Sequence, residues 1–179
     1  MRFTKCPNVL RKYGWCGILA LVYAIRLNMP TTEQSFDQLL EKFQTILGKR
    51  KATWGRNKDA RRNKSRGGIS SSETQCVLQH HNASCAHTFI PVKAAGIKMN
   101  VNQWLKGSSI PGLQVNTQYI VHTGKHAIFV DVPAKRSRWC LYDQGGPKTK
   151  ADASQMKKRG GVLLQKVHSV FVVSKIKPV

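Results

Sequence analysis

The chain has 179 residues, of which 30 are Lys or Arg and only 8 are Asp or Glu, so its formal net charge is +22. This length favours a single domain that needs no disulfide or metal to fold, and apolar residues grouped in periodic blocks exclude a wholly disordered chain. The excess of cations predicts a polyanionic partner, nucleic acid without sequence specificity first and the acidic surface of a larger assembly second.

Residues 17–28 are expected to form a central helix, because apolar side chains recur at helical spacing from Ile18 to Ile25 and few polar residues interrupt them. A second, amphipathic helix is expected up to residue 47, with Ser35 and Gln38 as its capping box and Gly48 ending it. The first of these helices is mostly apolar, so it should lie at the centre of the fold.

Residues 49–68 have a different character, with a single acid and nine cations. The cations are Lys49, Arg50, Lys51, Arg56, Lys58, Arg61, Arg62, Lys64 and Arg66. We interpret this segment as a basic loop inserted into one domain that covers residues 1–179, and as the main polyanion contact. A short third helix should follow from about Ser72 to His81, with Ser72 as its N-cap and Gln75 at its third position.

The second half of the chain is rich in Val, Ile, Phe, Tyr and Thr, which favours strands. Strands are expected at residues 87–92, 117–123, 126–132, 138–143 and 162–174. Gly124 and Lys125 should form a tight hairpin turn, residues 102–105 one helical turn around Trp104, and residues 144–161 a surface loop. Helices followed by a mostly antiparallel sheet define an α+β fold.

Three residues at the ends of these elements suggest nucleophilic catalysis. Cys16 lies at the start of the central helix, where the positive end of the helix dipole favours a thiolate. His126 opens one expected strand and Asp143 closes the next, so pairing of the two strands would let the carboxylate orient the imidazole. Singly, the three are a core cysteine, an edge histidine and a turn aspartate; together they indicate a catalytic set.

The ordered set resembles the papain-like cysteine peptidase superfamily, in which a Cys heads the central helix and a His and an Asn or Asp follow on the sheet. The stretches that carry the resemblance are Trp15-Cys16-Gly17, and Lys125-His126-Ala127-Ile128 followed by residues 139–146. The compact length is similar to that of viral leader peptidases, and of bacterial and phage peptidase and amidase branches. The resemblance implies a papain-like fold and hydrolysis of a protein or peptide without a cofactor.

In this reading, Cys16 is the nucleophile, His126 moves the proton and Asp143 orients His126. Asp131 is a rival for the orienting role, five residues after His126. The superfamily places an oxyanion Gln or Asn a short way upstream of the Cys, where this chain has Leu10 and Arg11. The remaining candidates are Asn8 and Gln144.

Loss of one oxyanion donor typically costs ~10²–10³ in rate. The alternative function is therefore a non-enzymatic basic structural protein, a minor capsid or ribonucleoprotein component that keeps a degenerate peptidase fold. Cys76, His80, Cys85 and His87 are a candidate metal site, because Cys76 and His80 are one helical turn apart. The spacing C-x3-H-x4-C-x-H matches no common zinc module, so we predict no metal.

The cysteines also indicate a compartment. Five are present: Cys6, Cys16, Cys76, Cys85 and Cys140. An odd number at irregular spacing is a poor disulfide framework and favours a reducing setting, the cytoplasm or nucleus. The compact length and the basic charge, in turn, suggest packaging in a virion. The N-terminal residues lack the apolar core of a secretory signal, and the apolar run from Ile18 to Leu27 is too short to span a bilayer.

Overall fold

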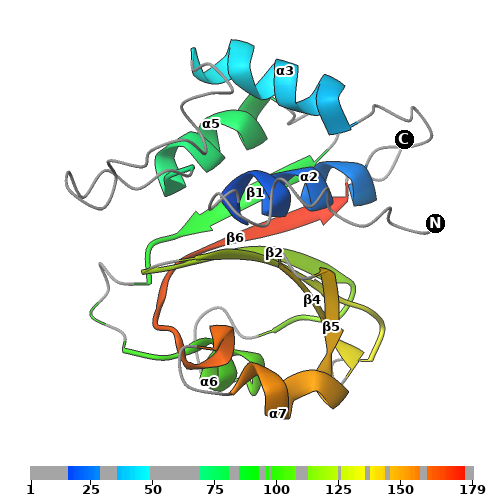
Figure 1. The fold of residues 1–179 in the computed structure, drawn as a ribbon, viewed down its shortest axis with the longest axis vertical. Coiled ribbons are helices and arrows are strands. Elements are labelled where there is room, and N and C mark those ends of the chain that lie inside the picture. The colour runs from blue at the N-terminus through cyan, green and yellow to red at the C-terminus, as the bar shows by residue number, and fades with distance from the viewer. Residues whose placement is uncertain are drawn as a thin grey trace.

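The structure is a computed structural model, and the residues it describes are 16–28, 36–48, 69–80, 85–92, 96, 98–107, 113–124, 126–135, 138–143, 146–157 and 161–175. The longer helices lie on one side of a six-stranded sheet: α2 (Cys16–Asn28), α3 (Phe36–Leu47) and α5 (Ser71–His80) (Figure 1). Short elements lie on the other side: α6 (Val101–Leu105), η3 (Lys150–Asp152), α7 (Ala153–Met156) and η4 (Val162–Leu164). The expected α+β class is confirmed.

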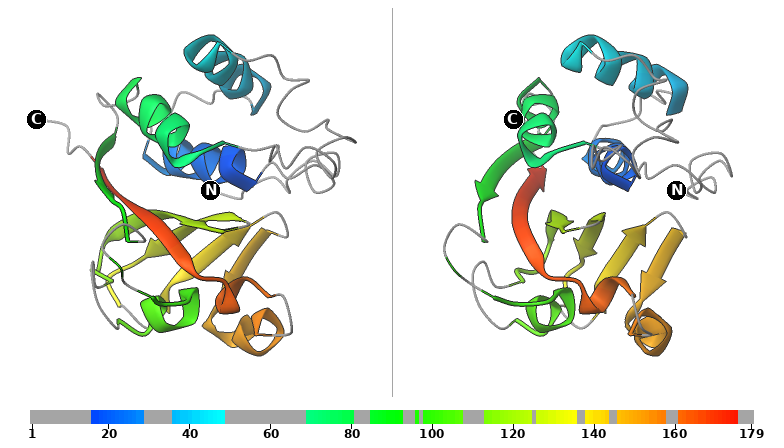
Figure 2. Two further views of the ribbon diagram at one scale, coloured as in Figure 1. Left: turned by 90° about the vertical axis from the view of Figure 1, so that its left-hand side faces the viewer. Right: turned by 60° about the vertical axis from the view of Figure 1, so that its left-hand side comes forward.

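The sheet is antiparallel throughout, as expected. Its strand order is β1 (Cys85–Ile90), β6 (Val167–Lys175), β2 (Thr117–Thr123), β3 (Ala127–Val132), β4 (Cys140–Asp143) and β5 (Gly146–Thr149). It is strongly curved, and β6 bends along its length (Figure 2). The curvature gives the sheet a convex side that faces α2 and a concave side that faces α6 and α7.

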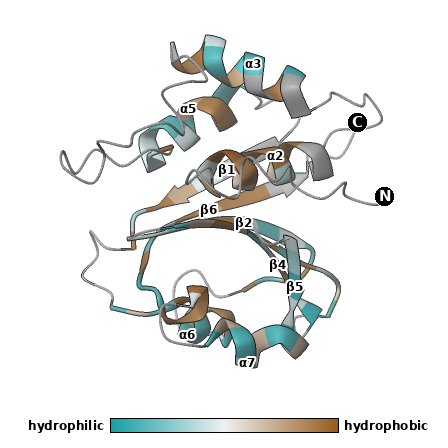
Figure 3. Cartoon of the chain, in the orientation of Figure 1, coloured by the Kyte–Doolittle hydropathy of each residue, from teal (hydrophilic) through white to brown (hydrophobic). Residues whose placement is uncertain are grey.

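Helix α2 occupies the position that its sequence predicts. Every side chain from Ile18 to Ile25 is buried, because α2 packs on β2, β3 and β4 on one side and on α5 on the other. The helix is apolar along most of its length (Figure 3). Tyr23 anchors it to the sheet, with its ring 6.3 Å from that of Phe129 and 4.9 Å from that of Tyr142. Because this packing fixes α2 against the sheet, it also fixes the position of Cys16, the first residue of α2.

Strand alternation divides the interior into two cores. In β2 and β3, Ile120 and Phe129 face the core under α2, whereas Tyr119 and Val130 face the core toward α6 and η4. Trp104 of α6 is fully buried in the second core and meets the ring of Tyr119 edge-on. The expected helical turn around Trp104 is confirmed. Both faces of the sheet are covered, so the strands are apolar at successive positions rather than at alternate ones.

The predicted cap of the third helix is wrong. Helix α5 begins at Ser71, and its capping box is formed by Ser70 and Glu73. The Ser70 hydroxyl accepts from the Glu73 N–H at 3.2 Å, and the Glu73 carboxylate accepts from the Ser70 N–H at 2.8 Å. Three successive serines allow more than one register. Tertiary contacts accompany the one adopted, since the Ser71 hydroxyl lies 2.8 Å from that of Ser169 on β6.

The surface loop expected at residues 144–161 is also wrong. Gly146 pairs with Asp143, and the described residues that follow form β5, η3 and α7. Gly146 has φ +93°, a conformation that side chains disfavour. Pro147 and Lys148 are poor strand formers, so pairing with β4 rather than local propensity makes this edge strand.

Several strand boundaries also differ from expectation: β3 begins at Ala127 instead of 126, and β4 at Cys140 instead of 138. Residues 162–164 form η4 instead of the start of a strand, and β6 begins at Val167. Strand β1 begins at Cys85, two residues before the expected 87. Within the described part of the chain, no helix has the length and apolar character needed to cross a bilayer.

Candidate active site

The β2–β3 hairpin positions His126. The Thr123 N–H donates to the His126 carbonyl at 2.7 Å, and the His126 N–H donates to Thr123 Oγ1 at 2.9 Å. These two bonds close the tight turn predicted at Gly124 and Lys125, and strand β3 begins at the next residue, Ala127. His126 is half-buried at the mouth of the strand. Both the N–H and the carbonyl of His126 are therefore hydrogen-bonded to Thr123.

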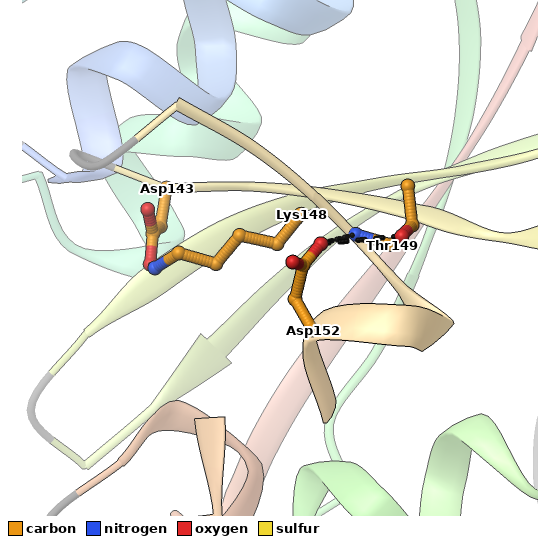
Figure 4. A network of polar contacts seen from close by, with 4 residues as sticks. All are labelled: Asp143, Lys148, Thr149 and Asp152. Carbon is orange, nitrogen blue, oxygen red and sulfur yellow. Dashed lines mark hydrogen bonds and ion pairs between the residues drawn. The ribbon is translucent and has the colours of Figure 1, made fainter. Parts of the chain in front are cut away.

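Asp143 ends the neighbouring strand β4. The register pairs Phe129 with Tyr142 and Val130 with Leu141, so the last residue of β4 and the first residue of β3 lie at the same end of these two strands. The Asp143 side chain is buried, with a residue exposure of 8%. Its Oδ2 forms an ion pair with Lys148 Nζ on β5 (Figure 4). The pairing of these strands, on which the sequence argument depended, is confirmed.

Cys16, in the helical layer, lies next to this end of β3 and β4. A backbone hydrogen bond links its thiol to Ala127, the residue that follows His126, and the charge of Asp143 also acts on it. Gly17 allows the start of α2 to lie close to the chain that leads into α5: a Cβ at Gly17 would lie 3.2 Å from Ile69 Cβ and 3.3 Å from its carbonyl oxygen. The first turn of α2, the start of β3 and the end of β4 therefore lie close together.

Burial disfavours the charged forms of both Cys16 and His126. It raises the pKa of the Cys16 thiol, although backbone hydrogen bonds from Ala127 and Gly17 oppose it, and the Asp143 charge raises it further. Burial also lowers the pKa of His126; Asp143 opposes this shift and Lys148 adds to it. Desolvation therefore outweighs the preference for a thiolate that a helix N-terminus provides. At neutral pH the residues are a thiol and an imidazole.

Lys148 is the residue that sequence reasoning missed. It lies within residues 144–161, for which the sequence predicts a surface loop, yet its ammonium forms an ion pair with the carboxylate of Asp143, the predicted partner of His126. The turn residues Gly145-Gly146 after a strand were a usable signal, because they allow a hairpin whose second strand contains Lys148. Lys148 and His126 both interact with Asp143, so the ion pair and the charge on the imidazole are coupled.

We expect Lys148→Met to raise the pKa of His126. The substitution removes a positive charge that disfavours the imidazolium and leaves the Asp143 carboxylate to stabilise it. An NMR titration of the His126 ring protons measures the shift, and Lys150→Met, at an exposed position two residues further along the chain, is the control. A His126 titration that is the same in both variants would contradict the coupling.

The other residues predicted for the site are Asp131, the oxyanion candidates and the basic segment. Asp131 pairs with Cys140 toward the end of β3, away from the strand mouth where His126 lies. Asn8, Gln144 and the basic segment 49–68 lie outside the described residues.

The weighed zinc set is split between α5 and the edge strand β1. Cys76 and His80 are exposed on α5, and the side chains of Cys85 and His87 are not among those described. Among the residues that the structure describes, no three His, Cys, Asp or Glu side chains gather as metal ligands would.

No protein-family model and no curated protein matches the sequence. Among solved structures, the crystal structure of the Pseudomonas avirulence protein AvrPphB matches over 96% of this chain and 96% of its own, with 9% sequence identity and a TM-score of 0.45. A likeness at that TM-score carries no argument here. The functional reading therefore depends on the residues and their geometry.

Proposed function

We propose that the chain is a thiol hydrolase of papain-like type, acting on peptide bonds through Cys16, His126 and Asp143. The observation that carries the proposal is the convergence of the first residue of α2 with the mouth of β3 and the end of β4. A hydrogen bond from Ala127 to the thiol and the charge of Asp143 on both Cys16 and His126 support it. The buried helix and the hairpin hold these groups on rigid elements, as catalysis requires.

The neutral resting pair suggests how the reaction would begin. As the Cys16 sulfur attacks the substrate carbonyl, His126 takes the thiol proton, and Asp143 stabilises the resulting imidazolium. His126 then returns the proton to the departing amine, which leaves a thioester on Cys16. Water hydrolyses the thioester, with His126 as base, and regenerates the thiol. The Cys16 backbone N–H is one oxyanion donor in this scheme, and Asn8 or Gln144 would be the second.

Two alkylating probes test the proposal. Iodoacetamide reports exposure and thiolate content, so it should modify the exposed Cys76 before Cys16, whose thiol is partly buried and has a raised pKa. A peptidyl chloromethyl ketone resembles an acyl substrate and should modify Cys16 first, because bound substrate places the carbonyl where His126 can assist. Mass spectrometry of tryptic peptides measures both rates.

The chloromethyl ketone preference should disappear in His126→Ala, while the iodoacetamide order should not change. Cys140 is the matched comparison, because it is partly buried and burial raises its pKa too. If the peptidyl reagent modifies Cys16 no faster than Cys140, the chain uses this fold as a scaffold without catalysis.

We further propose that the protein acts in a reducing compartment or a virion in association with a polyanion, nucleic acid first. The net charge of +22 supports this association, and nine of the cations fall within residues 49–68. The same charge would serve a non-enzymatic virion or ribonucleoprotein component, the second candidate function.

The logarithm of the affinity for single-stranded RNA should fall linearly with the logarithm of salt concentration, and replacing Arg61, Arg62, Lys64 and Arg66 by Ser should reduce that slope. An unchanged slope would place the contact elsewhere.

A further inference from the structure

A cavity of about 460 Å³ lies on the concave side of the sheet, away from α2 and the candidate active site. It is bounded by the end of α6, by Trp139 just before β4, and by η3 and α7. Its volume is within the range of roughly 300–1,000 Å³ that is usual for small-molecule sites.

Three lysines give this cavity its charge. Lys106 follows the last residue of α6, Lys150 begins η3 and Lys157 follows α7, so three separate chain positions contribute lysines to the lining of one cavity. Among the described residues that line the cavity there is no carboxylate. The cavity therefore favours an anion.

The nearest acid in the sequence is engaged elsewhere. Asp152 lies between Lys150 and Ala153, but its Oδ2 accepts from the backbone N–H of Thr149 at 2.8 Å and from its hydroxyl at 3.2 Å. Figure 4 shows Asp152 directed to Thr149, with Lys148 directed the other way to Asp143. The local acids thus cap a helix and hold Lys148, and neither lines the cavity beside the three lysines.

The floor of the cavity is apolar. Trp139 and Leu105 line it with only 6% and 7% of their surfaces exposed, and Asn102 adds one amide. A simple inorganic anion would use the lysines and leave this floor unmatched. An anion attached to an aromatic ring uses both, since the ring covers the apolar floor while the charged group meets the ammoniums.

We propose that the cavity binds a phosphate group carried on a nucleoside, either a free nucleoside monophosphate or the phosphorylated end of a nucleic acid strand. Phosphate chemistry suits a cluster of lysines, which act as point charges without requiring planar geometry. The base supplies the apolar surface that the floor matches. The proposal does not depend on catalysis by Cys16.

Calorimetric titration with AMP, adenosine and inorganic phosphate tests this assignment on the full chain. AMP should bind more tightly than either fragment. The triple substitution Lys106→Ser, Lys150→Ser and Lys157→Ser should weaken AMP binding by about tenfold or more, because it removes the charge-assisted contacts. The matched control replaces Lys98, Lys135 and Lys166, exposed lysines that do not line the cavity, by Ser; it removes the same net charge and should leave AMP affinity within about twofold, since exposed charges outside the cavity are largely screened.

Ala153→Leu gives a second readout, because it fills the cavity without changing any charge; AMP binding should be lost while the unfolding transition stays cooperative. A single-stranded oligonucleotide with a 5′ phosphate, compared with its 5′ hydroxyl form, separates the two sources. A 5′ phosphate advantage that the cavity variant removes identifies a strand end, and AMP binding without such an advantage identifies a free nucleotide. Equal loss in the control triple variant, or no saturable binding of AMP and no 5′ phosphate advantage, would overturn the proposal.

Discussion

Replacing Cys16 or His126 by Ala should each lower kcat/KM for peptide cleavage by on the order of 10⁴ or more, and the double variant should lose no more than either single one. Cys16→Ala removes the nucleophile. His126→Ala leaves a thiol whose pKa burial has raised, with no group to take its proton as it attacks. Because the two residues act as one unit, their losses should not add. Turnover of a general peptide library measures the effect.

Cys140→Ala is the control for this series. Cys140 is partly buried, as Cys16 is, but it begins β4 opposite Asp131, and its loss should leave kcat/KM unchanged. Denaturant unfolding of each variant separates a chemical loss from a folding one. Losses that multiply in the double variant would show that Cys16 and His126 act independently, and a parent with no turnover would favour the structural alternative.

The protein should lose about 3 kcal/mol of stability between pH 6.5 and pH 4 through His122 alone. His122 is 7% exposed on β2, its Nε2 lies 3.0 Å from Thr74 Oγ1, and its ring meets Phe171 edge-on. Burial, and to a lesser extent the nearby His168, lower the pKa of His122 to about 4. The unfolded chain takes up the proton first, near its ordinary pKa of 6.5. The stabilising contribution is therefore complete above that pH and is lost as the pH falls toward 4.

Urea unfolding at several pH values between 7.5 and 4 measures this loss. In His122→Gln the difference between the high and low pH stabilities should shrink by about the same amount, because a neutral amide does not titrate. His80→Gln, at an exposed position on α5, is the matched control and should keep the parent's pH dependence. Other groups titrate in the same window, so the comparison of the two variants carries the result; equal slopes in both would assign the acid sensitivity elsewhere.

Local sequence signals predicted much of this architecture. The apolar spacing of residues 17–28 predicted a buried helix, because a helix that is apolar on most sides must be covered on most sides. The β-branched strands and the Gly124-Lys125 turn predicted the hairpin, and with it the edge that His126 and Asp143 share. These signals are reliable because each depends on residues close together in the chain, whose steric preferences act without tertiary contacts.

Tertiary structure decided what depends on residues that are distant in sequence. The neutral state of Cys16 and His126 follows from desolvation by the packed layers, which local patterns do not encode. The cap of α5 was ambiguous among three serines, and strand β5 exists because β4 offers it a pairing edge.

The ion pair of Lys148 with Asp143, and the cavity that three lysines and Trp139 line together, likewise needed the folded chain. The amino-acid order alone therefore determined which elements form and which residues stand at their ends. The charges and ion pairs those residues carry were set only by packing, because electrostatic energies depend on burial and on distances through space.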